Sequence, residues 1–179
     1  MRREKLRRVA MLVCDVDGVM TDGGLYYDLQ GHISKKFHVQ DGFGVKLAQS
    51  AGLEIAVLTG LDSDAVRKRL EGLDIWQYYA GKQNKREPLL QIAAEKDYSM
   101  DQLAYLGDDW VDVPAMVEVG VPIAVANAQP EVKAVAEFVT QTPGGHGALR
   151  EAIVCLLKAQ DLFSTVWRQW TQQDADGFI

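Results

Sequence analysis

The chain has 179 residues, of which 47% are hydrophobic and 25% charged, and its formal net charge is -6. These values predict one folded domain with room for a short extension, and the negative charge argues against a general nucleic-acid binder. No stretch is long and apolar enough to cross a membrane. The basic N-terminus is followed by too short an apolar run for a signal peptide, and Cys14 and Cys155 lie in apolar segments typical of buried free thiols. We therefore expect a cytoplasmic protein.

The first predicted element is an apolar run over residues 9–14, which is typical of a strand buried on both faces. It leads into Asp15 and Asp17, whose side chains point to the same side of an extended backbone, and into Gly18, which permits a sharp turn. Two acids in this position either cap a turn or bind a divalent cation, because a cation offsets their repulsion. The segments that follow decide between these two interpretations.

Two short β-prone runs, residues 25–27 and 33–39, surround a turn that contains Gly31. They predict a hairpin over about residues 23–39, inserted directly after the acidic turn. This hairpin is either a flap over the acidic turn or an ordinary edge hairpin, and the sequence leaves both interpretations open.

The rest of the chain alternates between helices and strands with short connections. A helix with Asp41 as its N-cap is expected to end at Gly52. Further expected strands cover residues 54–60, 75–79, 103–106, 121–125 and 138–139, and further expected helices cover residues 63–70, 86–96, 113–119, 131–136 and 148–159. This alternation predicts a doubly wound α/β fold with a mostly parallel sheet. Such sheets bind ligands at the carboxyl ends of their strands.

Four polar segments fall at or just after expected strand ends, and together they offer the groups that phosphoryl transfer requires. In the first segment, Asp15 is the candidate nucleophile, which would form an aspartyl-phosphate, and Asp17 is the candidate acid and base. In the second, Thr59 supplies a hydroxyl, and the amide of Gly60 would bind the phosphate near a helix N-terminus.

The third and fourth segments supply charge. Lys85 is the candidate cation for the phosphate and the crowded carboxylates, with Lys82 and Arg86 as competitors for that role. Asp108 would complete the metal ligands begun by Asp15 and Asp17, with Asp109 or Asp112 behind it. Because these ligands are oxygens and the histidines show no ligand spacing, the expected ion is Mg²⁺.

The four segments, Asp15 to Asp22, Thr59-Gly60, Lys85 and Gly107 to Asp112, resemble the four motifs of the haloacid dehalogenase superfamily of phosphatases. The interval between Asp22 and Thr59 holds only a hairpin and a helix, so no cap domain fits. A fuller set of segments is similar to the family of 3-deoxy-D-manno-octulosonate 8-phosphate phosphatases over about residues 7–160; these are residues 22–27, 37–42, 107–109, 124–128 and 144–151.

The family resemblance implies Mg²⁺-dependent hydrolysis of that sugar-acid phosphate, which serves the synthesis of the inner sugar of lipopolysaccharide. It also implies a homotetramer whose hairpins and tails complete one another's sites. By the same resemblance the residues that bind the substrate, besides Gly60 and Lys85, are Gln40, Asp41, Gly42 and His146.

Three positions depart from the family pattern. Leu61 and Gln40 stand where arginine is common, and His146 stands where arginine or lysine is common. Because cations of this kind would bind the carboxylate of a sugar acid, the departures leave the substrate open. A nine-carbon ulosonate 9-phosphate is the alternative substrate, and a phospho-accepting signalling domain is the alternative of a different class.

Residues 161–179 extend beyond the phosphatase domain of residues 1–160. Phe163, Trp167 and Trp170 recur at helical spacing, which favours a subunit interface, with packing on the chain's own core as the alternative. By the family resemblance, residues 177–179 would enter a neighbouring active site. The basic N-terminus is either a solvated segment or a contact for phosphate or a partner.

Overall fold

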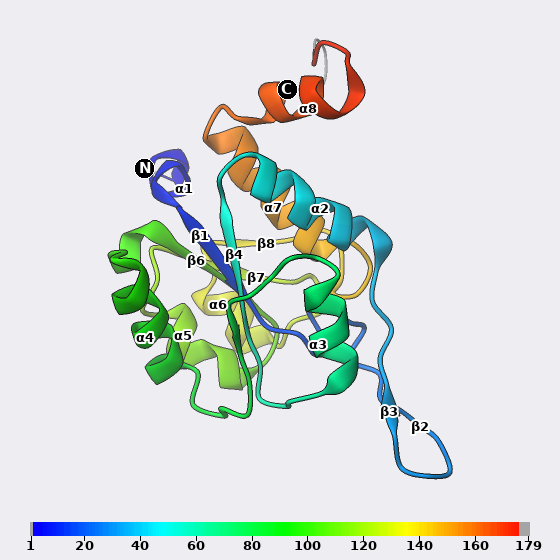
Figure 1. Ribbon diagram of the computed structural model, residues 1–179. Helices are drawn as coiled ribbons and strands as arrows, with labels where there is room; N and C mark the ends of the chain where they lie inside the picture. Colours follow the sequence, from blue (N-terminus) through cyan, green and yellow to red (C-terminus); the bar gives the residue numbers. More distant parts are fainter. Residues whose placement is uncertain (1, 176–179) are drawn as a thin grey trace.

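The central sheet of the computed structural model, which describes residues 2–175, has six parallel strands in the order β5-β4-β1-β6-β7-β8. The strands are β1 (Met11–Cys14), β4 (Glu54–Leu58), β5 (Tyr78–Tyr79), β6 (Leu103–Gly107), β7 (Val121–Ala124) and β8 (Phe138–Val139). The chain builds outward from β1 in one direction, then returns to place β6 on its other side (Figure 1). The strand order therefore reverses between β1 and β6.

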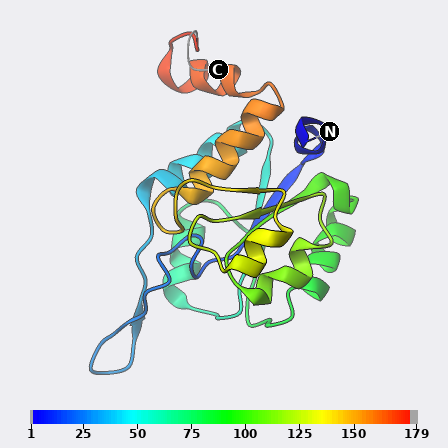
Figure 2. The same ribbon diagram turned by 180° about the vertical axis from the view of Figure 1, so that it is seen from behind.

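Helices cover both faces of this sheet (Figures 1 and 2). One face carries α2 (Val39–Ser50), α3 (Asp64–Glu71) and α7 (Ala148–Ala159), and the other carries α4 (Arg86–Lys96), α5 (Val113–Met116) and α6 (Pro130–Val135). This division follows from right-handed crossovers, because the direction of strand growth changes after β5. Every residue of β1 and of β6 is buried. This is expected of parallel strands that lie between two layers of helices. The doubly wound α/β fold is confirmed.

The hairpin consists of β2 (Tyr26–Tyr27) and β3 (Ile33–Ser34), which pair antiparallel. It projects away from the body of the molecule in both views (Figures 1 and 2), and Leu29 at its turn is 100% exposed. A single bridge between Thr21 and Phe37 closes its base. In this chain the base of the hairpin meets the body, while the tip stands in solvent.

Several element boundaries differ from the sequence prediction, and Asp41 gives the clearest reason. It was expected to cap α2, but α2 begins earlier, at Val39, with His38 as its N-cap. The Asp41 carboxylate instead accepts the backbone N–H of Arg150, at 2.8 Å. Arg150 lies in the first turn of α7, where backbone donors lack partners within the helix. Asp41 therefore caps a neighbouring helix, which sequence spacing within α2 does not reveal.

Two other expected elements are shorter than predicted. The strand expected over residues 75–79 is confined to β5, and the helix expected over residues 113–119 ends early, as α5 at Met116, with the 3-10 turn η2 (Trp110–Asp112) directly before it. A second 3-10 turn, η1 (Met100–Gln102), precedes β6. It has a capping box, in which the side chains of Ser99 and Gln102 each bond the other residue's backbone.

The basic N-terminus forms the helix α1 (Arg2–Arg8) at the amino end of β1, and its cations pair with carboxylates of this same chain. Arg3 and Arg7 both contact Asp161, and Lys5 lies 3.0 Å from Glu137. These ion pairs are exposed, so the basic helix is in contact with solvent and is also paired with carboxylates of its own chain.

The C-terminal extension forms the helix α8 (Phe163–Thr171), whose Trp170 lies against α2 and whose Phe163 lies beside Lys158 of α7. Trp170 meets Phe43 edge to face, with ring centroids 4.9 Å apart, and Val166 is buried. The alternative of packing on the chain's own core thus accounts for part of this face. Residues 177–179 lie outside the described residues, so their entry into a neighbouring site stays a prediction.

Within residues 2–175, none of the helices has the length and apolar character needed to cross a membrane.

Candidate active site

The four predicted segments converge on one pocket at the carboxyl end of the sheet. Asp15 follows β1, Thr59 follows β4, Asp108 follows β6, and Lys85 directly precedes α4. The pocket has a volume of about 400 Å³, and its lining residues are Asp15, Asp17, Thr59, Gly60, Leu61, Gln83, Lys85, Asp108, Asp109 and Val111. It lies where the strand order reverses, which is the position that this fold offers to ligands.

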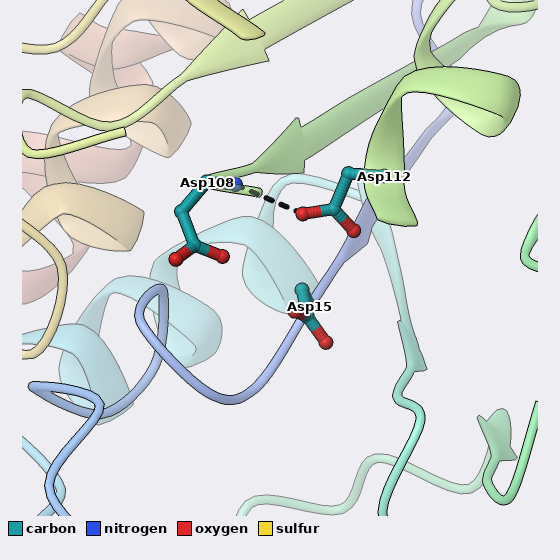
Figure 3. A group of neighbouring side chains, drawn as sticks. All are labelled: Asp15, Asp108 and Asp112. Carbon is teal, nitrogen blue, oxygen red and sulfur yellow. Dashed lines mark hydrogen bonds between the residues drawn. The ribbon is translucent and has the colours of Figure 1, made fainter. Parts of the chain in front are cut away.

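Three carboxylates crowd together in and beneath this pocket (Figure 3). Asp15, Asp108 and Asp112 each offer one oxygen, and these atoms lie within 4.8 Å of one another. Burial, and then the charge of Asp112, raises the pKa of Asp15 to about 7 and the pKa of Asp108 to about 8. The cluster is therefore electrostatically strained at neutral pH and suited to bind a cation.

Lys85 is the cation that this chain itself supplies to the cluster. Its Nζ lies 2.7 Å from Asp112 Oδ1, with which it forms a hydrogen bond, and 2.8 Å from Asp15 Oδ1, with which it forms an ion pair. Only 1% of the side chain is exposed. Burial alone would lower the pKa of Lys85, but Asp112 and Asp15 outweigh burial and raise it. Its two competitors, Lys82 and Arg86, are exposed side chains outside the pocket lining.

Asp112 is fully buried, and each of its oxygens has two donors. Oδ1 accepts from Lys85 and from the hydroxyl of Tyr105, at 2.7 and 2.8 Å, while Oδ2 accepts the backbone N–H of Asp108 at 2.9 Å and of Asp109 at 3.2 Å. A carboxylate saturated in this way holds other residues in place and has no lone pair left for a metal. Through Oδ2 it holds the backbone that carries Asp108, and its expected role behind a metal ligand stays a prediction.

Tyr105 is a member of this network that the sequence argument missed. It is fully buried in the middle of β6, and its hydroxyl reaches Asp112 Oδ1 at 2.8 Å. The sequence did offer a signal for this role, because Tyr105 is a hydroxyl-bearing residue in an otherwise apolar strand. A buried tyrosine requires a hydrogen-bond partner.

Asp17 also lines the pocket, and its partner comes from the hairpin. Lys35 Nζ lies 2.6 Å from Asp17 Oδ1 and 2.7 Å from Asp17 Oδ2. The sequence argument did not foresee this contact, because it depends on the path that the hairpin takes.

Behind the acidic turn lies the loop of residues 143–147, which requires glycine for packing. A Cβ atom at Gly144 would lie 1.7 Å from the carbonyl oxygen of Gly18, and one at Gly145 would lie 2.2 Å from the backbone nitrogen of Asp22. The N–H of Gly145 also donates to Val19 O, at 2.9 Å. This loop therefore supports the turn that carries Asp15 and Asp17.

The residues assigned to substrate binding by family resemblance occupy two different settings. Gly60 and Lys85 line the pocket, whereas Gln40, Asp41, Gly42 and His146 lie outside its lining as the described residues form it. Asp41 and Gly42 are buried, while Gln40 and His146 are exposed. A role for these four residues in binding substrate stays a prediction.

This fold, with Asp15 and Asp108 at its strand ends and Lys85 just before α4, defines a haloacid dehalogenase-like hydrolase. The family of that description matches residues 71–151. The 3-deoxy-D-manno-octulosonate 8-phosphate phosphatase of Haemophilus influenzae is 40% identical over 88% of this chain and 88% of its own length. The enzyme of that name from Escherichia coli K12 is 37% identical over 87% of this chain and 83% of its own.

Solved structures agree with these relatives. The 3-deoxy-D-manno-octulosonate 8-phosphate phosphatase of Moraxella catarrhalis, in complex with magnesium, phosphate and KDO, superposes with a TM-score of 0.92 at 32% identity and covers 95% of this chain and 98% of that one. The phosphatase of the same name from Yersinia pestis has a TM-score of 0.88 at 36% identity, covering 90% and 87%. The chain belongs to the family of 3-deoxy-D-manno-octulosonate 8-phosphate phosphatases.

Proposed function

We propose that this protein is a Mg²⁺-dependent phosphatase that hydrolyses 3-deoxy-D-manno-octulosonate 8-phosphate to the free sugar acid and phosphate, in the synthesis of the inner sugar of lipopolysaccharide. The observation that carries the reaction is the buried Asp15, with Lys85 and Asp108 around it in one pocket. The names of the relatives support the substrate, and the contents of the Moraxella structure support both the metal and the product.

The donor set fits a divalent cation. Asp108 Oδ1 is buried and has no hydrogen-bond partner among the described residues, and oxygen ligands of this kind suit Mg²⁺. Asp15, Asp17 and Asp108 would hold the ion, with Asp109 and Asp112 behind them. Bound there, Mg²⁺ would neutralise negative charge on the phosphoryl group during transfer.

The reaction has two steps, each carried by residues of this pocket. In the first, a carboxylate oxygen of Asp15 attacks phosphorus, the bond from phosphorus to the sugar oxygen breaks, and Asp17 gives that oxygen a proton. In the second, water attacks the aspartyl-phosphate, Asp17 takes a proton from the water, and phosphate leaves with Asp15 restored. Thr59 and the Gly60 amide would bind phosphate oxygens, and Lys85 holds Asp15 in place.

We also infer the assembly and the location of the protein, and the family membership supports this inference. We expect a cytoplasmic homotetramer with shared active sites, bound to neither nucleic acid nor membrane. The exposed apolar residues of the hairpin, Leu25, Tyr26, Tyr27 and Leu29, support a protein partner there, because solvent-exposed apolar groups of this size mark contact surfaces. Light scattering of the purified chain would give the mass of the assembly.

The nine-carbon ulosonate 9-phosphate remains the second candidate substrate, and Leu61 is the observation that keeps the choice of substrate open. Leu61 lines the pocket and is 41% exposed, where an arginine would offer a charge-assisted contact to a sugar-acid carboxylate. The signalling-domain alternative predicts a stable phospho-protein without turnover, which distinguishes it from both phosphatases.

The decisive experiment measures Mg²⁺-dependent phosphate release from a panel that contains both ulosonate phosphates and simple sugar phosphates. The control is Asp15→Asn, which keeps the size of the side chain and removes the nucleophile. We expect the wild-type protein to favour the eight-carbon substrate and the variant to be inactive. Wild-type activity no greater than that of the variant would rule out the enzyme, and a preference for another sugar phosphate would correct the substrate.

A further inference from the structure

The contact between Lys35 and Asp17 links the hairpin to the candidate acid and base. The ammonium lies within 2.7 Å of both carboxylate oxygens of Asp17. The Lys35 side chain is 0% exposed, whereas 32% of the Asp17 side chain remains open to the pocket. A lysine side chain is rarely fully buried unless it is paired. The contact with Asp17 therefore accounts for the burial of Lys35.

The base of the hairpin sets the position of Lys35. Residues 21 and 37 are joined by the bridge that closes the hairpin, so the segment that carries Lys35 runs back beside the acidic turn. The next lysine, Lys36, points elsewhere: its side chain is 54% exposed and lies 3.4 Å from Asp22. Of these two adjacent lysines, Lys35 alone contacts Asp17, and the two form a matched pair for comparison.

We propose that Lys35 is a positioning residue that orients the Asp17 carboxylate and so couples the base of the hairpin to proton transfer at the leaving oxygen. This proposal rests on the proposed phosphatase activity. A carboxylate rotates easily about its terminal torsion, and an ammonium that contacts both oxygens restricts that rotation. When Asp17 presents one oxygen to the leaving group, Lys35 keeps its contact with the other oxygen and fixes the direction of approach.

The role predicts a dependence on the leaving group. A sugar alkoxide departs poorly unless it receives a proton as its bond to phosphorus breaks, whereas a nitrophenolate departs without one. A residue that only stabilises the fold would affect both reactions alike. A residue that positions Asp17 affects the sugar phosphate far more than the nitrophenyl phosphate.

The test compares Lys35→Met with Lys36→Met on 3-deoxy-D-manno-octulosonate 8-phosphate and on p-nitrophenyl phosphate. We expect Lys35→Met to lower kcat for the sugar phosphate about 100-fold, with little change in KM, and to lower kcat for the nitrophenyl ester less than about 3-fold. Lys36→Met should leave both unchanged. Equal losses on the two esters, no loss, or a gain in kcat would overturn the proposal.

Two further measurements test the proposal, and the second of them needs no substrate. In the Asp17→Asn background, Lys35→Met should cause no further selective loss, as expected when one residue acts through another. Hydrogen exchange of the metal-free protein should be faster over residues 33–38 in Lys35→Met than in the wild type or Lys36→Met. If the wild-type protein hydrolysed neither ester, the proposed function would fail, but hydrogen exchange would still test the contact between Lys35 and Asp17. Unchanged exchange in Lys35→Met would refute the proposed role of Lys35.

Discussion

The two ends of the central sheet carry the same kind of interaction in opposite surroundings. At the carboxyl end, Lys85 pairs with Asp15 and Asp112, and the three side chains are at most 7% exposed. At the amino end, the α1 cations pair with Asp161 and Glu137 in contacts where the cations are about half exposed. Exposed pairs contribute little to stability, whereas breaking a buried pair leaves an uncompensated charge. Only the carboxyl end can therefore use its charges for chemistry.

Lys85→Met removes the cation of the buried ion pairs and should have the largest effect on stability and activity. It leaves Asp15 and Asp112 buried without their cation, so we expect the metal-free protein to lose about 3–5 kcal/mol of unfolding free energy. We also expect kcat to fall by about 100-fold or more. Urea unfolding and phosphate release measure the two losses. Lys46→Met is the control, because Lys46 pairs with the exposed Asp74; an equal loss there would contradict the comparison.

Tyr105→Phe removes one donor from the same network and keeps the ring in the core. Asp112 Oδ1 then retains only Lys85, and the unfolding free energy should fall by about 1–3 kcal/mol. Because Asp112 also holds the backbone of Asp108, we expect weaker Mg²⁺ binding, measured by calorimetry. Unchanged Mg²⁺ affinity would show that the hydroxyl serves stability alone.

The pH dependence of the metal-free protein tests the crowding of carboxylates. Asp15 and Asp108 have pKa values of about 7 and 8 in the fold, against 3.8 for an ordinary aspartate. Between pH 4 and pH 8 the folded state holds more protons than the unfolded state, so the unfolding free energy should fall as pH rises through that window. Mg²⁺ offsets the charge, so its stabilisation should be larger at pH 8 than at pH 5. Thermal unfolding with and without Mg²⁺ measures both trends, and Asp108→Asn should weaken them.

Asp161→Ala tests the exposed end and should have the smallest effect. It removes the shared partner of Arg3 and Arg7, yet water solvates both arginines when the pair is lost. We expect the midpoint of thermal unfolding and kcat to match those of the wild type. A large loss of stability would mean that α1 docking matters more than its exposure indicates.

Much of the fold and the core of the site followed from local pattern. Apolar runs of strand length, each ended by a polar turn, indicated β1, β4 and β6, and parallel strands bring their carboxyl ends together. Asp15, Thr59 and Asp108 then share one edge by topology alone. What local pattern missed were contacts between distant segments: Asp41 with the backbone of α7, Lys35 with Asp17, and Tyr105 with Asp112. Each depends on how elements pack, and no spacing within one element encodes it.

The close packing of Gly144 on Gly18 bears on when the site forms. Every group assigned to chemistry, from Asp15 to Asp112, precedes the glycine loop in the order of synthesis. The turn that holds Asp15 and Asp17 gains its support only when a segment more than a hundred residues later in the chain closes onto it. Long-range closures of this kind form late in folding. A growing chain would thus carry all of its reactive side chains before it has a working catalyst.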